Sequence, residues 1–371
     1  MSRLRVGVIY GGKSGEHEVS IASAASIFKY LDRNKYETVP ILIGKDGRWA
    51  LAARPPELMS AADVHAAANA ATQSLAAEAD LTRSAPQTIE PTTALTDRHI
   101  DVVFPVLHGP YGEDGTVQGL FELANVPYVG AGVLGSAAGM DKAVMKTLFQ
   151  ARGLPVGPYL VVMRREWDRA RKGITSRVAR ELAYPVFVKP ANLGSSVGIS
   201  KARTDDELAD AMRTALQFDR KIVIEAAVPR AREIECAVLG NDDPHASIPG
   251  EIVTTHEFYD YSAKYLDADG STCVIPASLE PDQVREIQRL SIEAFQAVDG
   301  SGLARVDFLM AGDSGAIVVN EVNTMPGFTT ISMYPKMWAA TGLPYADLLD
   351  RLITLAMERH AEKQQLRTSI T

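Results

Sequence analysis

Four polar side chains near the C-terminal end have the types and spacing of a magnesium and phosphate site. Arg305 and Asp307 stand two residues apart in one apolar run, Glu321 and Asn323 in the next, with a glycine-flanked turn between the runs. Alternate side chains of a β-strand share a face, so pairing of the two runs in a hairpin would bring all four together. Their three oxygen donors suit a divalent cation that bridges nucleotide phosphates, and the arginine would stabilise negative charge on the reacting group.

An exposed hairpin with ordinary salt bridges is the alternative. Against it, the two runs also carry an apolar opposite face, supplied by Val306, Phe308, Val318, Val319 and Val322. The segment 324–327 that follows, Thr-Met-Pro-Gly, predicts a turn whose backbone N–H groups could meet an oxyanion.

A lysine followed by a small flexible loop indicates phosphate binding elsewhere in the chain. Lys189 stands at the end of an apolar run, and glycines and serines occupy positions 194–198. Glycine and serine let backbone amides approach phosphate oxygens closely, and the lysine adds charge. Such a loop alone is usually just a turn, but with Lys142 nearby and a metal site further on, a nucleotide held between two domains explains the set better.

Two loops near the N-terminus are candidates for binding a substrate. Glu16 follows the first apolar run, and His108 opens a glycine-rich loop after a later one. Ligands of parallel sheets lie at the carboxyl ends of the strands, where a carboxylate could hold a substrate ammonium. The stretch Gly7–Ser14 fits the P-loop pattern, but its variable residues continue a strand, so we reject that interpretation.

A fourth polar segment, 256–265, is rich in tyrosine and contains Lys264 and Tyr265. Two interpretations fit this segment equally well. It is either a loop that closes over phosphates and excludes water, or a tyrosine-rich loop on the surface.

The apolar patterns that carry these residues predict an α/β protein with three domains. Strands at 4–10, 36–43 and 100–107, with a helix at 21–31 capped at Ser20, indicate an N-terminal doubly wound parallel sheet in residues 1–138, with an alanine-rich insert at about 52–96. A helix at 141–152 and strands at 159–162, 186–189 and 221–225 form a central domain, 139–226. Strands at 235–240, 251–254, 305–310 and 316–323, with helices at 281–298 and 345–365, form the third domain, 227–371.

Composition narrows the class of protein. The 371 residues are 46% hydrophobic and 23% charged with a net charge of -8, which allows a sizeable core and argues against a nucleic-acid binder. Two cysteines are too few for a disulfide framework, and we expect Cys236 and Cys273 to be buried small hydrophobes in a reducing compartment. The sequence has no signal-peptide core and no membrane span. We therefore expect a cytoplasmic enzyme that acts on small molecules.

Taken in order, the motifs at 11–20, 108–115, 189–198, 259–265 and 305–327 resemble the D-alanine:D-alanine ligases of the ATP-grasp superfamily over nearly the whole chain. The resemblance implies the three-domain ATP-grasp architecture, with ATP between the second and third domains, D-alanine against the first, two Mg²⁺ or Mn²⁺ ions and a homodimer. It implies that ATP phosphorylates the carboxylate of one D-alanine, and that the amine of a second displaces the phosphate.

The resemblance also implies a role for individual residues. Catalytic roles fall to Glu16, Ser195, Tyr265 and Arg305, and D-alanine binding to His108, Gly327, Ser332 and Met333. ATP binding falls to Lys142, Lys189, Ser196, Glu225, Ala226, Ala227, Val228, Glu233 and Lys264, and the metal ions to Asp307, Glu321 and Asn323.

Three other functions are alternatives to this one. A related ligase could use D-lactate or another amino acid, although Tyr265 favours a peptide over an ester product because relatives that form the ester lack this tyrosine. A nucleotide-binding regulator without turnover has little need of the full Arg305, Asp307, Glu321 and Asn323 set. A purely structural protein would leave the order of the motifs unexplained.

Overall fold

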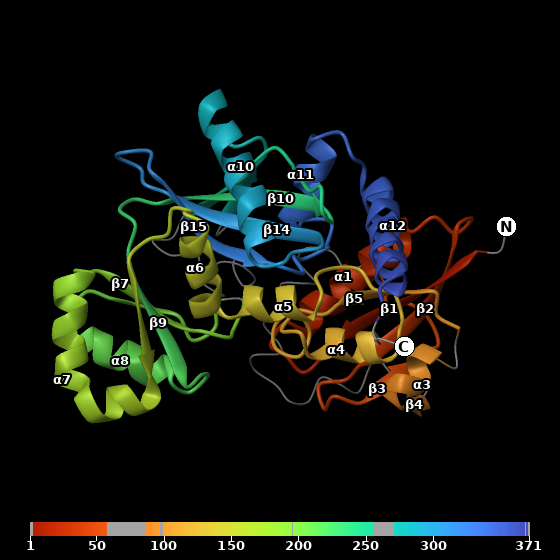
Figure 1. Cartoon of the computed structure of the whole chain (residues 1–371), viewed down its shortest axis with the longest axis horizontal. Helices are drawn as coiled ribbons and strands as arrows, with labels where there is room; N and C mark the ends of the chain where they lie inside the picture. The colour runs from red at the N-terminus through yellow and green to blue at the C-terminus, as the bar shows by residue number, and fades with distance from the viewer. Residues whose placement is uncertain are drawn as a thin grey trace.

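Three β-sheets organise the chain in this computed structural model, which describes residues 3–57, 87–96, 99–194, 196–254, 271–367 and 369. Figure 1 shows the N-terminal sheet in red and orange, a small central unit in yellow and green, and the C-terminal sheet with β10 in green to teal and β14 and β15 in blue. The sequence prediction of an α/β fold is confirmed, and the division into three domains stays a prediction.

The N-terminal sheet has the order β4-β3-β2-β1-β5. Its strands are β1 (Leu4–Gly11), β2 (Tyr36–Ile43), β3 (Trp49–Leu51), β4 (Gln87–Ile89) and β5 (Val102–Val106). As predicted, β1 pairs in parallel with β2 and β5. The antiparallel edge strands β3 and β4 were not predicted, because three residues are too few to show a period.

Helices cover both faces of this sheet because side chains of β1 alternate between two cores. Val6 and Val8 pack with α1 (His17–Tyr30), and Ile9 packs on the other side with α3 (Pro91–Thr96) and α4 (Thr116–Leu123). The sheet is therefore wound on both sides, which brings the loops after β1 and β5 to one carboxyl-terminal edge.

The predicted cap at Ser20 is wrong. Helix α1 begins at His17, and Ser20 lies buried in its first turn. Its hydroxyl accepts a hydrogen bond from Gly11 N at 2.7 Å and donates to Val106 O. The hydroxyl satisfies backbone groups at the ends of two strands instead of the helix terminus, and it thereby ties together the two loops that carry Glu16 and His108.

The central unit is a four-stranded antiparallel sheet of order β6-β9-β7-β8 with two helices. It consists of β6 (Tyr159–Met163), α7 (Arg164–Glu181), β7 (Val186–Pro190), β8 (Ser200–Ala202), α8 (Asp205–Ala215) and β9 (Lys221–Ala226). These elements bury a core of their own, which includes Trp167, Val188 and Met212.

The C-terminal sheet has the order β13-β12-β10-β14-β15, with β11 beside β10. Its strands are β10 (Arg232–Gly240), β11 (His245–Ala246), β12 (Gly250–Thr254), β13 (Ser271–Val274), β14 (Gly302–Met310) and β15 (Ile317–Asn323). Its helices are α10 (Pro281–Ala297), α11 (Met333–Ala340) and α12 (Tyr345–Gln364), and α5 (Val133–Met140) and α6 (Lys142–Ala151) pack against β15.

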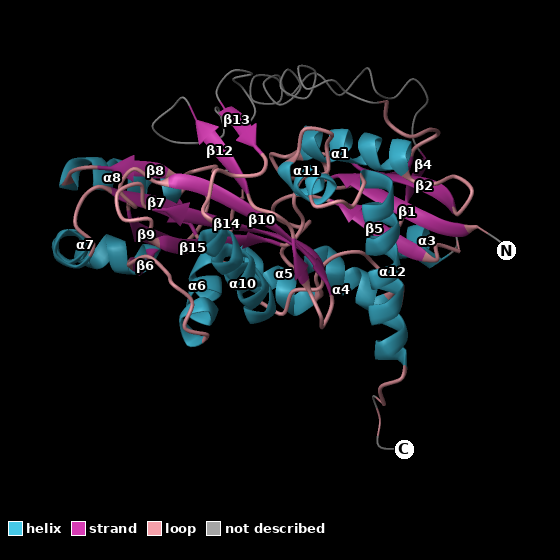
Figure 2. Cartoon of the chain, turned by 90° about the horizontal axis from the view of Figure 1, so that it is seen from above, coloured by secondary structure: helices cyan, strands magenta, loops and turns pink. Residues whose placement is uncertain are grey.

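The N-terminal and C-terminal sheets share one hydrophobic core, whereas the central unit does not. Val8 and Phe104 of the first sheet lie in the same buried cluster as Leu303, Phe328 and Leu349. Helix α12 contacts both β5 and β14 (Figure 2). The predicted domain boundaries stay a prediction. The packing places α6 with the C-terminal sheet, because Met145 and Phe149 are buried in the cluster of that sheet.

Only one of the two cysteines is buried as predicted. Cys236 lies inside β10, but Cys273 is exposed because β13 is the outer strand of its sheet. Within the described part of the chain, no helix has both the length and the apolar character that crossing a bilayer requires.

If α12 belongs to the shared core, removing a buried side chain of α12 should destabilise the protein, and Leu349 tests this. This side chain of α12 has 0% exposure, so Leu349→Ala should lower the free energy of unfolding by about 2–5 kcal/mol, measured by urea denaturation. Leu123 is 89% exposed, and Leu123→Ala is the matched control with an expected change within about 0.5 kcal/mol. Equal effects of the two substitutions would contradict the assignment of α12 to the core.

Candidate functional site

The pairing of β14 with β15 brings the four polar residues together as the sequence predicted. Arg305 lies opposite Asn323, and Asp307 lies opposite Glu321. The Arg305 Nε and Nη2 atoms each donate to one Asp307 oxygen at 2.7 Å, and Asn323 Nδ2 donates to Asp307 Oδ2 at 2.9 Å. The shared face is therefore confirmed, and the role of each residue stays a prediction.

A β-bulge in this hairpin adds a residue that the sequence analysis missed. The register shifts after Asp307, so that Phe308 pairs with Val319 and Asn320 has no partner in the ladder. Strict alternation would turn Asn320 away from Glu321, but the bulge turns its side chain towards the cleft, where Oδ1 accepts from Lys189 Nζ at 3.5 Å. No sequence pattern predicts this bulge.

Arg305 is held as a cation by two carboxylates. Besides Asp307, Glu235 of β10 places Oε2 3.1 Å from Arg305 Nε. Burial alone would lower the pKa of this guanidinium, but the charges of Asp307 and Glu235 outweigh burial and raise it. Glu235 was also missed, although its alternation with Glu233 on β10 was a signal that both face the cleft.

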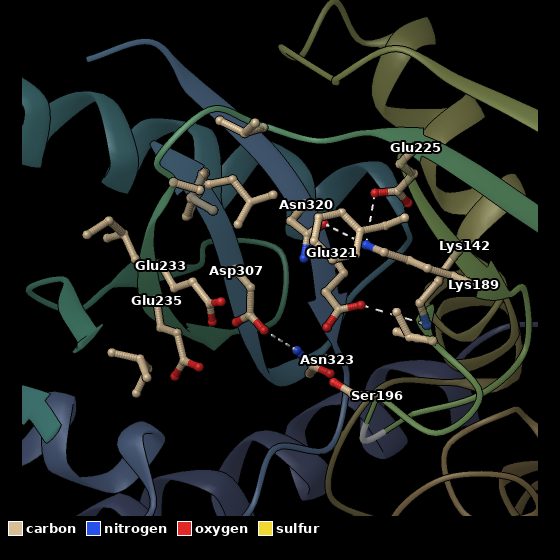
Figure 3. A pocket seen from close by; sticks show the side chains of 18 of the residues that line it. Lys142, Lys189, Ser196, Glu225, Glu233, Glu235, Asp307, Asn320, Glu321 and Asn323 are labelled. Carbon is tan, nitrogen blue, oxygen red and sulfur yellow. Dashed lines mark hydrogen bonds and ion pairs between the residues drawn. The ribbon is translucent and has the colours of Figure 1, made fainter. Parts of the chain in front are cut away.

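Between the central unit and the C-terminal sheet lies a cavity of about 570 Å³, large enough for a nucleotide (Figure 3). Side chains from both sheets and from α6 reach it. It is lined by eight of the predicted ATP-binding residues and all three predicted metal ligands, namely Lys142, Lys189, Ser196, Glu225, Ala226, Ala227, Val228, Glu233, Asp307, Glu321 and Asn323.

Two lysines carry charge into this cavity from different elements. Lys142 Nζ, on α6, lies 3.7 Å from Glu321 Oε2 and donates to Leu193 O at 2.7 Å. Lys189 Nζ, at the end of β7, donates to Glu225 Oε2 at 2.9 Å. Burial opposes the charge of Lys189, but Glu225 and Glu321 outweigh burial and raise its pKa, so the ammonium is retained.

A third lysine, Lys146, stands behind the cavity wall, with Nζ 3.2 Å from Glu225 Oε1. Burial would raise the pKa of Glu225, but Lys146 and Lys189 together lower it to about 2. Lys146 was missed, although its spacing of four residues from Lys142 places both on one face of a helix.

His108 lies at the edge of the N-terminal sheet as a neutral imidazole. Its Nδ1 is 3.0 Å from Met325 O, and because a carbonyl oxygen only accepts, Nδ1 carries the proton. Burial lowers the pKa of His108, against the opposing charge of Glu16. Its Nε2 is buried without a partner among the described residues, so it offers an acceptor to a ligand group.

The loop after β7 approaches the acidic edge of the N-terminal sheet closely. A methyl group at Gly194 would lie 3.3 Å from Glu16 Oε2 and 3.8 Å from Glu113 Oε1. The loop that closes the nucleotide cavity therefore also borders the predicted D-alanine site. Glu113, a carboxylate of the same glycine-rich loop as His108, accepts from Gly109 N at 3.0 Å and lines the nucleotide cavity.

The turn before α11 brings three predicted substrate-binding residues together. Ser332 Oγ accepts from Thr329 N at 3.0 Å, and a methyl group at Gly327 would lie 3.0 Å from the same oxygen. Met333 is buried at the first position of α11. The first-turn amides of a helix favour a carboxylate, so this arrangement suits an amino-acid ligand.

The predicted site therefore divides into two neighbouring parts. Outside the lining of the nucleotide cavity lie Glu16, His108, Arg305, Gly327, Ser332 and Met333. The predicted residues Ser195, Lys264 and Tyr265 lie outside the described residues.

The oxygen donors of the hairpin fit a magnesium ion that is shared with a ligand. In the described ranges, no cluster of three or more His, Cys, Asp or Glu side chains could enclose a metal ion by itself. The Asp307 and Glu321 carboxylates nevertheless point into the same space beside Asn323 (Figure 3). Mg²⁺ usually takes one or two carboxylates and completes its octahedron with substrate phosphates and water, which this donor set allows.

Comparison with known proteins identifies the class and then the family. Solved structures of similar fold are ATP-grasp ligases. The D-alanine-D-alanine ligase of Coxiella burnetii has a TM-score of 0.79 at 38% identity and covers 98% of this chain and 97% of its own. The VanG D-Ala:D-Ser ligase of Enterococcus faecalis has a TM-score of 0.78 at 33% identity and covers 96% and 100%.

The family models D-ala D-ala ligase N-terminus and D-ala D-ala ligase C-terminus match residues 5–131 and 148–354. The D-alanine--D-alanine ligases of Heliobacterium modesticaldum and Bacillus cytotoxicus are 50% and 48% identical, over 98% and 100% of both chains. The chain belongs to the D-alanine:D-alanine ligase family.

Glu113 makes a prediction about stability and pH. Burial and the neighbouring Glu16 raise the pKa of Glu113 to about 8. Above its ordinary pKa the carboxyl ionises in the unfolded chain but stays protonated in the folded one, so stability falls as pH rises from about 5 to 8. Glu113→Gln cannot ionise, and its melting temperature relative to the wild type should rise by a few degrees across that range.

Glu166, exposed on α7, is the control: the offset of Glu166→Gln from the wild type should stay constant with pH. A constant offset for Glu113→Gln as well would show that Glu113 is not kept protonated by the fold.

Proposed function

We propose that the chain joins two D-alanine molecules to D-alanyl-D-alanine at the expense of ATP, releasing ADP and phosphate, for peptidoglycan precursor synthesis. The observation that carries the proposal is the cavity in which the predicted ATP residues meet the Asp307 and Glu321 pair. Full-length relatives that are D-alanine--D-alanine ligases, at 48–50% identity, support it.

A carboxylate is a poor electrophile, so it must be activated before an amine attacks it. Transfer of the γ-phosphoryl group of ATP to the first D-alanine gives an acyl phosphate, in which phosphate is a leaving group. Lys142 and Lys189 offset negative charge on the phosphates. Asp307, Glu321 and Asn323 would hold two Mg²⁺ or Mn²⁺ ions, which would supply further charge compensation.

In this proposal, the two D-alanine molecules bind next to the core that the N-terminal and C-terminal sheets share. Glu16 pairs with the ammonium of the first D-alanine, and the unprotonated Nε2 of His108 accepts from it. Arg305 and the Gly327 amide stabilise the oxyanion that forms when the second amine attacks. Ser332 and the first turn of α11 take the carboxylate of the second D-alanine.

Ser195 and Tyr265 are proposed to complete the catalytic group with Glu16, and Lys264 to reach the phosphates. We further propose that the enzyme works in the cytoplasm as a homodimer without nucleic-acid or membrane partners, consistent with its net charge of -8.

The second amino acid is the open choice within this family. A D-Ala:D-Ser ligase has the same fold at 33% identity, so the fold does not select the acceptor. The protein is incubated with D-alanine as the first substrate and with D-alanine, D-serine and D-lactate as competing acceptors. Mass spectrometry should show D-alanyl-D-alanine as the main product. Predominance of another product would replace the substrate and leave the reaction class intact.

Phosphate release tests the proposal directly. The purified protein with ATP and Mg²⁺ should release phosphate only when D-alanine is added. Glu321→Gln should reduce turnover by roughly 100-fold or more, because it removes charge at the metal and phosphate position. Glu358, exposed on α12, is the control, and Glu358→Gln should retain wild-type turnover. Wild-type turnover in Glu321→Gln would refute the metal assignment.

A further inference from the structure

The turn that carries Gly327 is held in place by side chains of other elements. Residues 324–328 lie between β15 and α11, and within the described ranges no backbone–backbone hydrogen bond reaches them. Side chains bind their backbone instead: His108 from the loop after β5, Ser23 from α1 and Tyr345 from α12. The position of this turn therefore depends on residues that are distant in the sequence.

Ser23 makes the least expected of these contacts. The residue is 0% exposed, and its hydroxyl oxygen accepts from Phe328 N at 3.1 Å. A serine inside a helix often bonds to its own helix, as Ser26 does by donating to Ala22 O at 3.2 Å. The hydroxyl of Ser23 instead satisfies a buried amide 305 positions away. Tyr345 donates to the carbonyl oxygen of Phe328, so both backbone polar groups of this residue are bound by side chains.

The amide of Gly327 lies between two tethered peptide units. On one side, Met325 O accepts from His108 Nδ1 at 3.0 Å, and on the other, Phe328 N donates to Ser23. The Gly327 amide itself donates to no group of the described residues, so it is available to a ligand. A glycine has no side chain that could hold its conformation, and the two tethers therefore set the direction of its amide.

Helix α1 connects this turn to the acidic end of the amino-acid site. Glu16 is the residue at which α1 begins, and its carbonyl accepts from Ser20 N at 3.0 Å in the first turn. Ser23 lies seven residues further, which is about 10 Å along the helix axis. Because two turns of a helix form a rigid unit, Glu16 and the tethered Phe328 keep a constant separation.

We propose that Ser23 is a positioning residue for the first amino acid. By binding Phe328 N, it sets the distance between Glu16, at the ammonium group, and the Gly327 amide, at the carboxyl group. Tyr345 holds the same turn from the side of α12. Ser23 acts through the backbone and does not touch the substrate. The inference rests on the proposed function for the identity of the substrate and of its two ends.

Steady-state kinetics of phosphate release test this inference. Ser23→Ala removes the acceptor of Phe328 N, so the Gly327 amide shifts while Glu16 stays in place. The kcat should fall by about 10-fold to 100-fold, since a misplacement of about 1 Å can cost 100-fold. The KM values for D-alanine should change by less than about threefold. Expressing kcat per nucleotide site titrated with ADP removes any contribution from unfolded protein.

Ser26→Ala is the matched control for this substitution. Ser26 is buried in the same helix, but its hydroxyl donates within α1. This variant should keep the wild-type kcat. Equal kcat values for Ser23→Ala and Ser26→Ala would overturn the inference, and so would a raised KM with an unchanged kcat in Ser23→Ala.

Amide hydrogen exchange, followed by mass spectrometry, gives a readout that needs no turnover. In Ser23→Ala, peptides that contain Phe328 should exchange about fivefold faster than in the wild type, the value of one net hydrogen bond, whereas Ser26→Ala should match the wild type. Tyr345→Phe frees the other end of Phe328 and should also speed exchange and lower kcat. This variant replaces Ser23→Ala if the latter does not fold.

The two measurements separate this inference from the proposed function. A wild type that releases no phosphate with D-alanine would refute the proposed function, and hydrogen exchange alone would then decide whether the two hydroxyls hold the turn. Exchange at the wild-type rate in both Ser23→Ala and Tyr345→Phe would overturn the inference, whether or not the wild type is active.

Discussion

The register of the β14–β15 hairpin decides what the cleft contains. Asp307 opposite Glu321 places two carboxylates in one space, and Arg305 opposite Asn323 flanks them. A slip of one residue would move the whole set to the other face, where Val306 and Phe308 now build the core. The apolar side chains therefore enforce the register that the polar side chains need, since burying the polar set would cost far more than one hydrogen bond. The same hairpin ends in the turn that carries Gly327, so its position fixes both parts of the site.

Charge in this site is organised in two groups that repeat one arrangement. In one group a cation, Arg305, lies between Glu235 and Asp307, and in the other an anion, Glu225, lies between Lys146 and Lys189. A single buried ion pair often does not offset its desolvation. A shared central ion keeps its charge because both neighbours favour it, and each outer group keeps part of its field for a ligand. These charged side chains are thereby fixed in place, and they need not reorganise when negative charge moves between phosphate groups during a reaction.

Local patterns were enough to predict the central strands of the three sheets and the shared face of the β14–β15 hairpin. Spacing of two in a strand predicted that Arg305 joins Asp307, and the structure confirms it. The parts that failed depend on contacts far apart in the chain. Asn320 faces the cleft only because of a bulge. Lys146 forms its ion pair with Glu225, which lies on another sheet. Glu113 likewise owes its raised pKa to burial and to the distant Glu16. Neither a motif nor a period encodes such tertiary partners.

The division of the hydrophobic cores explains how one fold serves related ligases. The proposed amino-acid end, with His108 and Ser332, adjoins the core that the N-terminal and C-terminal sheets share. The nucleotide end lies between that body and the separately packed central sheet. In the proposed amino-acid end, Glu16, His108 and Gly327 stand in loops between strands and helices, where substitutions leave the strands that line the nucleotide cleft in place. A D-Ala:D-Ser ligase with a TM-score of 0.78 fits this view. In the proposed function, side chains of a few loops choose the acceptor, and the paired sheets hold the groups that bind ATP.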